Sequence, residues 1–123
     1  MRSKLALLLA VGALMLVMAA GAALAVTFTC TQARCVGTNN PDRITGTARS
    51  QTIIGKGAND RLIDTQGQDH DSLRGRIGND TLNAQEGNNA TGNTDRVNGG
   101  PGRDTCFVDN KDSLVSCEVV NPS

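Results

Sequence analysis

Gly99-Gly100-Pro101-Gly102-Arg103-Asp104-Thr105-Cys106-Phe107 is the clearest copy of a nine-residue sequence motif that recurs along most of this chain. Glycines come first, an aspartate stands sixth, and an apolar position stands eighth. A fixed internal period indicates a repeat architecture, in which each copy forms one structural unit. The copies run from residue 37 to residue 115, with the bounds 37–45, 46–54, 55–63, 64–74, 75–83, 84–98, 99–107 and 108–115.

Odd-numbered and even-numbered copies differ in a regular way. Every odd copy has the regular length and keeps the sixth-position aspartate, which gives the set Asp42, Asp60, Asp80 and Asp104. The even copies contain the insertions, the shortened copy and the one replaced aspartate, Gln51. A coil with two short strands per full turn explains this alternation, because odd turns then stack along one edge and even turns along the other. We therefore expect insertions on one edge only.

The eighth positions predict the core. Side chains alternate between the two faces of a strand, so the middle residue of a three-residue strand points inward. Helix is not expected, because glycine recurs often and no apolar period of 3.6 residues appears. Two facing ladders of inward residues should therefore form a narrow core, made of Ile44, Ile53, Leu62, Leu73, Leu82, Val97, Cys106 and Leu114.

The repeat resembles the hemolysin-type (RTX) calcium-binding nonapeptide, Gly-Gly-x-Gly-x-Asp-x-apolar-x. This resemblance implies an all-β fold, a right-handed parallel β-roll in which six residues form each metal-binding turn and three form each strand. It also implies Ca²⁺ as the cofactor, bound along the odd edge. The metal-ligating residues expected from the motif are Asp42, Asp60, Asp80, Asp104, Gly55, Gly57, Gly75, Gly78, Gly99 and Gly102.

Elementary electrostatics supports a cation in the odd turns. Neighbouring parallel strands lie about 4.8 Å apart. At that spacing two carboxylates repel by roughly 3 kcal/mol at an effective dielectric of 20. Calcium takes six to eight oxygens, which two stacked turns can supply from carboxylates and carbonyls. We expect up to three ions, one in each gap between the four odd turns.

A metal-free alternative is that the aspartates shape turns or pair with Arg43, Arg61 and Arg103, because Asx turns form without any ion. Calcium is the favoured interpretation for the odd edge, where glycines and aspartates agree in register. For the even edge, turn shaping is favoured, because Gln51 has no charge and Asp71 and Asp95 follow insertions.

The N-terminus predicts export. Arg2 and Lys4 precede an apolar run that ends in Ala23-Leu24-Ala25, which is typical of a cleaved secretory signal over residues 1–25. An uncleaved membrane anchor is the alternative, because the run is long enough to span a bilayer. The remaining chain divides into an N-terminal cap (26–36), the β-roll repeats (37–115) and a C-terminal cap or tail (116–123). After cleavage, no stable membrane insertion is expected.

The four cysteines predict disulfides. A short exported chain with few large apolar groups commonly needs disulfides or metals for stability. Cys30, Cys35, Cys106 and Cys117 allow three connectivities. The solenoid implied by the resemblance favours Cys30–Cys35 and Cys106–Cys117, because its two ends lie far apart.

These patterns favour a secreted calcium-binding protein whose metal is structural and couples folding to extracellular calcium. The alternative is an extracellular adhesion-type module that uses the inserted loops 66–71 and 86–94 with little or no metal. An enzyme is not expected, because no catalytic arrangement stands out from the repeat. Nucleic acid is not an expected partner, because there is neither a basic tract nor an aromatic platform. The sequence does not identify a protein or glycan partner.

Overall fold

The computed structural model describes residues 24–67, 70–87 and 94–122, and all its regular structure is β-strand within these ranges. The strands are β1 (Thr27–Thr29), β2 (Arg34–Val36), β3 (Arg43–Thr45), β4 (Thr52–Lys56), β5 (Arg61–Ile63), β6 (Ser72–Arg76), β7 (Thr81–Asn83), β8 (Arg96–Asn98), β9 (Thr105–Val108), β10 (Ser113–Val115) and β11 (Val119–Pro122). Most are three residues long, as the nonapeptide implies. The predicted signal peptide lies almost wholly outside the described residues.

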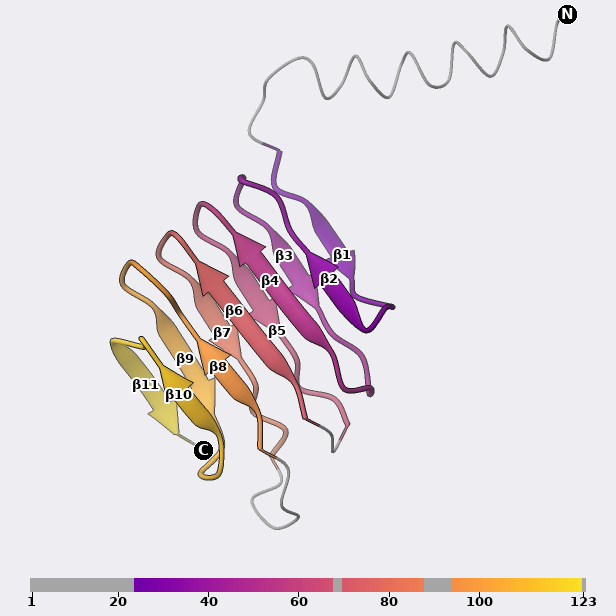
Figure 1. Ribbon diagram of the computed structural model, residues 1–123, viewed down its shortest axis with the longest axis vertical. Helices are drawn as coiled ribbons and strands as arrows, with labels where there is room; N and C mark the ends of the chain where they lie inside the picture. The colour runs from indigo at the N-terminus through magenta and orange to yellow at the C-terminus, as the bar shows by residue number, and fades with distance from the viewer. Residues whose placement is uncertain (1–23, 68–69, 88–93, 123) are drawn as a thin grey trace, which may run out of the picture.

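The strands alternate between two parallel sheets. One sheet has the order β1-β3-β5-β7-β9-β11 and the other has the order β10-β8-β6-β4-β2. Every recorded strand pair is parallel. Successive coils therefore stack from β1 to β11 with the two sheets face to face (Figure 1). The predicted parallel β-roll is confirmed, with the odd turns on one edge and the even turns on the other.

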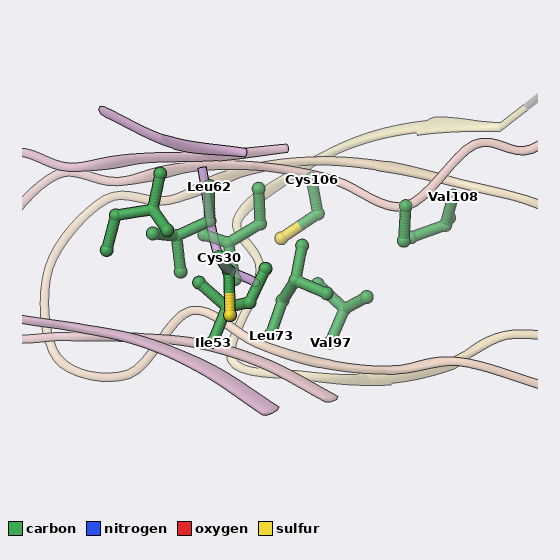
Figure 2. Packing of buried hydrophobic residues seen from close by; sticks show 10 residues of the cluster. Cys30, Ile53, Leu62, Leu73, Val97, Cys106 and Val108 are labelled. Atoms are coloured by element: carbon green, nitrogen blue, oxygen red, sulfur yellow. The ribbon is translucent and has the colours of Figure 1, made fainter. Parts of the chain in front are cut away.

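The register places the eighth-position residues directly above one another. Ile44, Leu62 and Leu82 pair in sequence along the six-stranded sheet, followed by Cys106. Ile53, Leu73 and Val97 pair along the five-stranded sheet, followed by Leu114. The first seven of these eight residues are fully buried, and Leu114 is partly buried near the open end. Figure 2 shows Leu62 and Cys106 facing Ile53, Leu73 and Val97 across the narrow interior.

Both ends of the repeat region continue the same coil. In the segment expected to form the N-terminal cap, β1 pairs with β3 and β2 pairs with β4. At the C-terminal end β11 pairs with β9. Disulfides join Cys30 to Cys35 and Cys106 to Cys117, with Cα–Cα distances of 5.7 and 6.0 Å, so the favoured connectivity is confirmed. Each bond closes a short segment within one end of the coil.

The insertions of the fourth and sixth copies occur on the even edge. Residues 68–69 and 88–93 of the proposed binding loops lie outside the described residues, so the structure does not test an adhesive role for these loops. Among the described residues, no helix is long and apolar enough to cross a membrane.

Candidate metal centre

The aspartates of the odd turns form one continuous file. The backbone N–H of Asp42 donates to Asp60 Oδ1 at 2.8 Å, that of Asp60 donates to Asp80 Oδ1 at 2.7 Å, and that of Asp80 donates to Asp104 Oδ1 at 2.7 Å. The four carboxyl groups predicted to share an edge are therefore brought together, each above the next.

Glu118 extends the file by one carboxylate. The backbone N–H of Asp104 donates to Glu118 Oε2 at 2.8 Å, as the preceding aspartates donate to their neighbours. Sequence reasoning missed this residue because it lies beyond the eighth copy. A signal was present, however: Glu118 directly precedes β11, just as Asp104 directly precedes β9.

Three of these aspartates are buried and only half satisfied. Asp60, Asp80 and Asp104 expose 3%, 1% and 0% of their surface. Their Oδ1 atoms accept the backbone bonds described above, but their buried Oδ2 atoms have no hydrogen-bond partner within the described part of the chain. An ionised carboxylate with an unsatisfied buried oxygen is costly, and a bound cation is one way to compensate. The orphaned oxygens therefore fit a metal site.

Asp42 differs because its own turn satisfies its carboxylate. Thr38 donates its backbone N–H to Asp42 Oδ2, and its hydroxyl oxygen lies 2.9 Å from the same atom. The Asp42 Oδ1 atom accepts the N–H of Val26 at 3.1 Å. Asp42 therefore closes the N-terminal end of the file with a carboxylate that accepts hydrogen bonds from the protein, and its predicted role as a metal ligand stays a prediction.

The first glycine of each odd turn opens space for these oxygens. A Cβ added at Gly75 would lie 2.3 Å from Asp80 Oδ2 and 2.7 Å from the carbonyl oxygen of Gly99. A Cβ added at Gly99 would lie 2.4 Å from Asp104 Oδ2 and 2.3 Å from the carbonyl oxygen of Ser116. A carboxylate oxygen of one turn and a carbonyl oxygen of the next thus converge at each glycine, and these are the hard oxygen ligands that calcium prefers.

Position four has a positive φ in three of the odd turns, where it is occupied by Ala58, Gly78 and Gly102. Gly78 and Gly102 have φ values of +135° and +131°, a region that glycine adopts readily. Each of these glycines also lies against a backbone carbonyl of the preceding odd turn: a Cβ on Gly102 would lie 1.9 Å from the carbonyl oxygen of Gly78. Gly57, at position three, does not have a positive φ and lies against Asn39 of the preceding odd turn. Gly57 is therefore less constrained than the other glycines predicted to line the site.

Burial and like charge act together on the file. Desolvation raises the pKa of Asp60 to about 7, with further contributions from the neighbouring Asp80 and Asp42 carboxylates. Desolvation also raises the pKa of Asp80 to about 6, with Asp104 adding to the shift. The pKa of Asp104 is raised by burial first and by Glu118 second. In each case a backbone N–H opposes the shift without cancelling it.

These shifts predict that the calcium-free chain loses stability as the pH rises from about 4 through 7. The folded pKa values exceed the ordinary value of 3.8, so the folded chain binds protons more tightly than the unfolded chain. The stabilisation is fully present below pH 4 and is lost as the pH passes about 6 and then 7. Urea unfolding in calcium-stripped buffers should show this fall. A free energy of unfolding that rises over the same range would contradict it.

The even edge repeats the same arrangement. The backbone N–H of Gln51 donates to Asp71 Oδ1 at 2.7 Å, that of Asp71 donates to Asp95 Oδ1 at 2.8 Å, and that of Asp95 donates to Asp112 Oδ1 at 3.0 Å. Insertions precede Asp71 and Asp95 but do not disturb this file. The expectation that the even aspartates shape turns agrees with these bonds, yet their stacking matches that of the odd edge.

Gln51 ends the even file without a charge. Its Oε1 accepts the backbone N–H of Thr47 at 2.7 Å. Its Nε2 donates to the carbonyl oxygens of Cys30 and Gln32, both at 2.7 Å. The Gln51 amide thus donates hydrogen bonds to two carbonyl oxygens near the preceding turn. At this end of the even file, as at the Thr38–Asp42 end of the odd file, protein groups supply the hydrogen bonds of the terminal side chain.

A carboxylate from the sixth copy joins the even file. One carboxylate oxygen from each of Asp71, Glu86 and Asp95 lies within 4.8 Å of the others. Sequence reasoning missed Glu86 as a candidate ligand because it lies in the inserted loop 86–94, where no repeat position identifies it.

Comparison with known proteins agrees with this geometry. The family model of the RTX calcium-binding nonapeptide repeat (4 copies) matches residues 36–70, 65–90 and 89–106, which together span more than half of the chain. No curated protein and no solved structure matches the chain. The stacked turns, the paired files of acidic residues and the family match show that this chain is a member of the RTX calcium-binding nonapeptide repeat family, and Ca²⁺ is the ion of its repeats.

Proposed function

We propose that this protein is secreted and that structural calcium bound along its odd edge couples its folding to extracellular calcium. The ligands are Asp60, Asp80 and Asp104 with carbonyl oxygens of the adjoining glycine-containing turns. The observation that carries the proposal is the set of buried Oδ2 atoms that lack a hydrogen-bond partner within the described part of the chain. The role is non-catalytic.

The arrangement suits calcium because neighbouring turns contribute oxygens to the same place. Asp80 Oδ2 and the Gly99 carbonyl converge at Gly75, and Asp104 Oδ2 and the Ser116 carbonyl converge at Gly99. An ion between two turns would supply positive charge to two carboxylates at once, which offsets both their desolvation and their mutual repulsion. Neither turn alone offers the six to eight oxygens that calcium takes.

Calcium then stabilises the fold by mass action. The unfolded chain does not hold carboxylates of distant copies together, so ions bind the folded state preferentially. A single such site stabilises the fold by about 4 kcal/mol at a free calcium concentration 1,000 times its Kd. Several sites in one file would together contribute a stabilising free energy that is large for a chain whose hydrophobic core is so narrow. Disulfides at both ends are compatible with an oxidising, extracellular compartment.

A calcium titration tests this proposal. We expect the disulfide-intact chain lacking residues 1–25 to gain β-structure by far-UV circular dichroism and to melt at a higher temperature on addition of millimolar calcium, and to lose part of both gains on addition of a chelator. Magnesium at the same concentration is the control, because it keeps its waters and demands octahedral geometry, and it should produce little change. Equal spectra and equal melting temperatures in calcium and in chelator would refute the proposed coupling.

Export has its own test. N-terminal sequencing of the protein recovered from the medium of an expressing cell should begin near Val26. Retention of residues 1–25 in a membrane fraction would contradict secretion and support the anchor alternative, without affecting the calcium result.

A further inference from the structure

The fold separates the charges of this chain. The strands of the five-stranded sheet contain Lys and Arg but no Asp or Glu, whereas the carboxylates described above lie in the turns. Side chains alternate between the two faces of each strand, so positions next to inward residues such as Leu73 and Val97 point outward. Five of the outward side chains are exposed cations. This basic face consists of Arg34, Lys56, Arg74, Arg76 and Arg96, on the sheet nearer the viewer in Figure 1.

Two hollows lie on the basic face and share Arg74. One has a volume of about 390 Å³ and is lined in part by Arg74, Arg76 and Asn98. The other has a volume of about 380 Å³, and its lining includes Arg74, Arg96, Thr52 and His70. Its lining also includes Asp71, which is buried and whose Oδ1 accepts the Gln51 N–H. Arg74 thus connects two concave surfaces into one path across β4, β6 and β8.

Two positively charged side chains are neighbours on adjacent strands of this face. Lys56 and Arg76 are direct partners in the β4–β6 register. Cations placed directly opposite each other across a parallel pair repel and destabilise the sheet. Both residues also adopt positive φ values, +85° and +76°, at turn positions where the seventh copy has Gly100. An anionic ligand that spans neighbouring strands would relieve the repulsion.

We propose that the basic face binds an acidic polysaccharide. A chain of uronic acids presents one carboxylate on each sugar, so it can meet cations on successive strands. Its hydroxyl groups suit the polar residues Thr52 and Asn98 that line the hollows. Nucleic acid fits less well, because single-strand binding uses successive aromatic side chains for base stacking, whereas neither hollow is lined by Phe, Tyr or Trp and His70 is the one imidazole in the two linings.

A pair of matched double variants tests the proposal in calcium-saturated buffer. Arg74→Gln/Arg96→Gln removes two cations from the basic face. Arg43→Gln/Arg61→Gln removes two cations that pair in register on the outer face of the other sheet, so the change in net charge is the same. Binding of a fluorescent, short oligogalacturonate would be measured by anisotropy at fixed ionic strength. We expect at least about a tenfold loss for the first variant, as for a lost charge-assisted hydrogen bond, and less than about twofold for the second.

Three results would overturn the proposal. These are equal losses in both double variants, equal binding of neutral dextran, or tighter binding of a single-stranded oligonucleotide of matched charge. Circular dichroism in calcium checks that each variant is folded. If the first double variant does not fold, the single variant Arg74→Gln replaces it, and at least about a threefold loss is expected from this shared residue. Because wild-type calcium binding is measured separately, failure here is distinguishable from failure of the calcium proposal.

Discussion

Replacing Gly55 with alanine is expected to lower the free energy of unfolding by about 3 kcal/mol in calcium-saturated buffer. The new Cβ would lie 2.3 Å from Asp60 Oδ2 and 2.9 Å from the carboxyl carbon. Asp60 is held in place, because its Oδ1 accepts the backbone N–H of Asp42 and its own N–H donates to Asp80. The carboxylate would have to leave the file to relieve the clash. Urea unfolding followed by circular dichroism measures the loss.

Gly57→Ala is the matched control in the same turn. A Cβ at Gly57 would have as its nearest neighbour the side-chain oxygen of Asn39, at 3.3 Å, and Asn39 is exposed and can adjust. Gly57 does not have a positive φ, so alanine introduces no backbone strain. We expect a change within about 0.5 kcal/mol. Equal losses at the two positions would show that glycine serves general turn flexibility and not the oxygen cradle beside Asp60.

The repeat period predicted the parts of the structure that depend on spacing. Ile44, Leu62 and Leu82 stack because their copies share one register, and insertions on the even edge leave that register intact. The odd aspartates align for the same reason. Their burial follows from their place two residues before an inward residue, because alternate residues of an extended chain share one face.

What spacing could not predict is which donor satisfies each oxygen. Thr38 and Asp42 belong to a regular copy, yet the Thr38 side chain turns toward Asp42 Oδ2 and distinguishes this carboxylate from those of Asp60 and Asp80. The side-chain rotamer and the tertiary contacts decide which donor reaches each carboxylate oxygen, and neither can be read from the repeat period of the sequence. Glu118 was missed for a different reason: it takes the place of a repeat aspartate in a turn that is too short to align with the nonapeptide.

Asp80→Asn is expected to shift stability in opposite directions with and without calcium. In calcium-free buffer at pH 7.5 the wild-type carboxylate is ionised at a buried position between Asp60 and Asp104, and burial raises its pKa to about 6. Asparagine removes that charge and retains an oxygen to accept the Asp60 N–H, so the free energy of unfolding should rise by about 1–2 kcal/mol. In saturating calcium the same variant lacks a charged ligand that borders two gaps, so stability should fall by about 2 kcal/mol.

Asp42→Asn is the control because the same change is made at the end of the file. Thr38 and Val26 already donate to the Asp42 carboxylate, and a neutral amide oxygen accepts these bonds less strongly. We expect this variant to be destabilised in both buffers, with no change of sign. Thermal melts of the wild type and both variants, each in calcium and in chelator, supply all the comparisons. If Asp80→Asn is destabilised in both buffers as well, the buried aspartates act as hydrogen-bond acceptors that shape turns, and calcium does not compensate their charge.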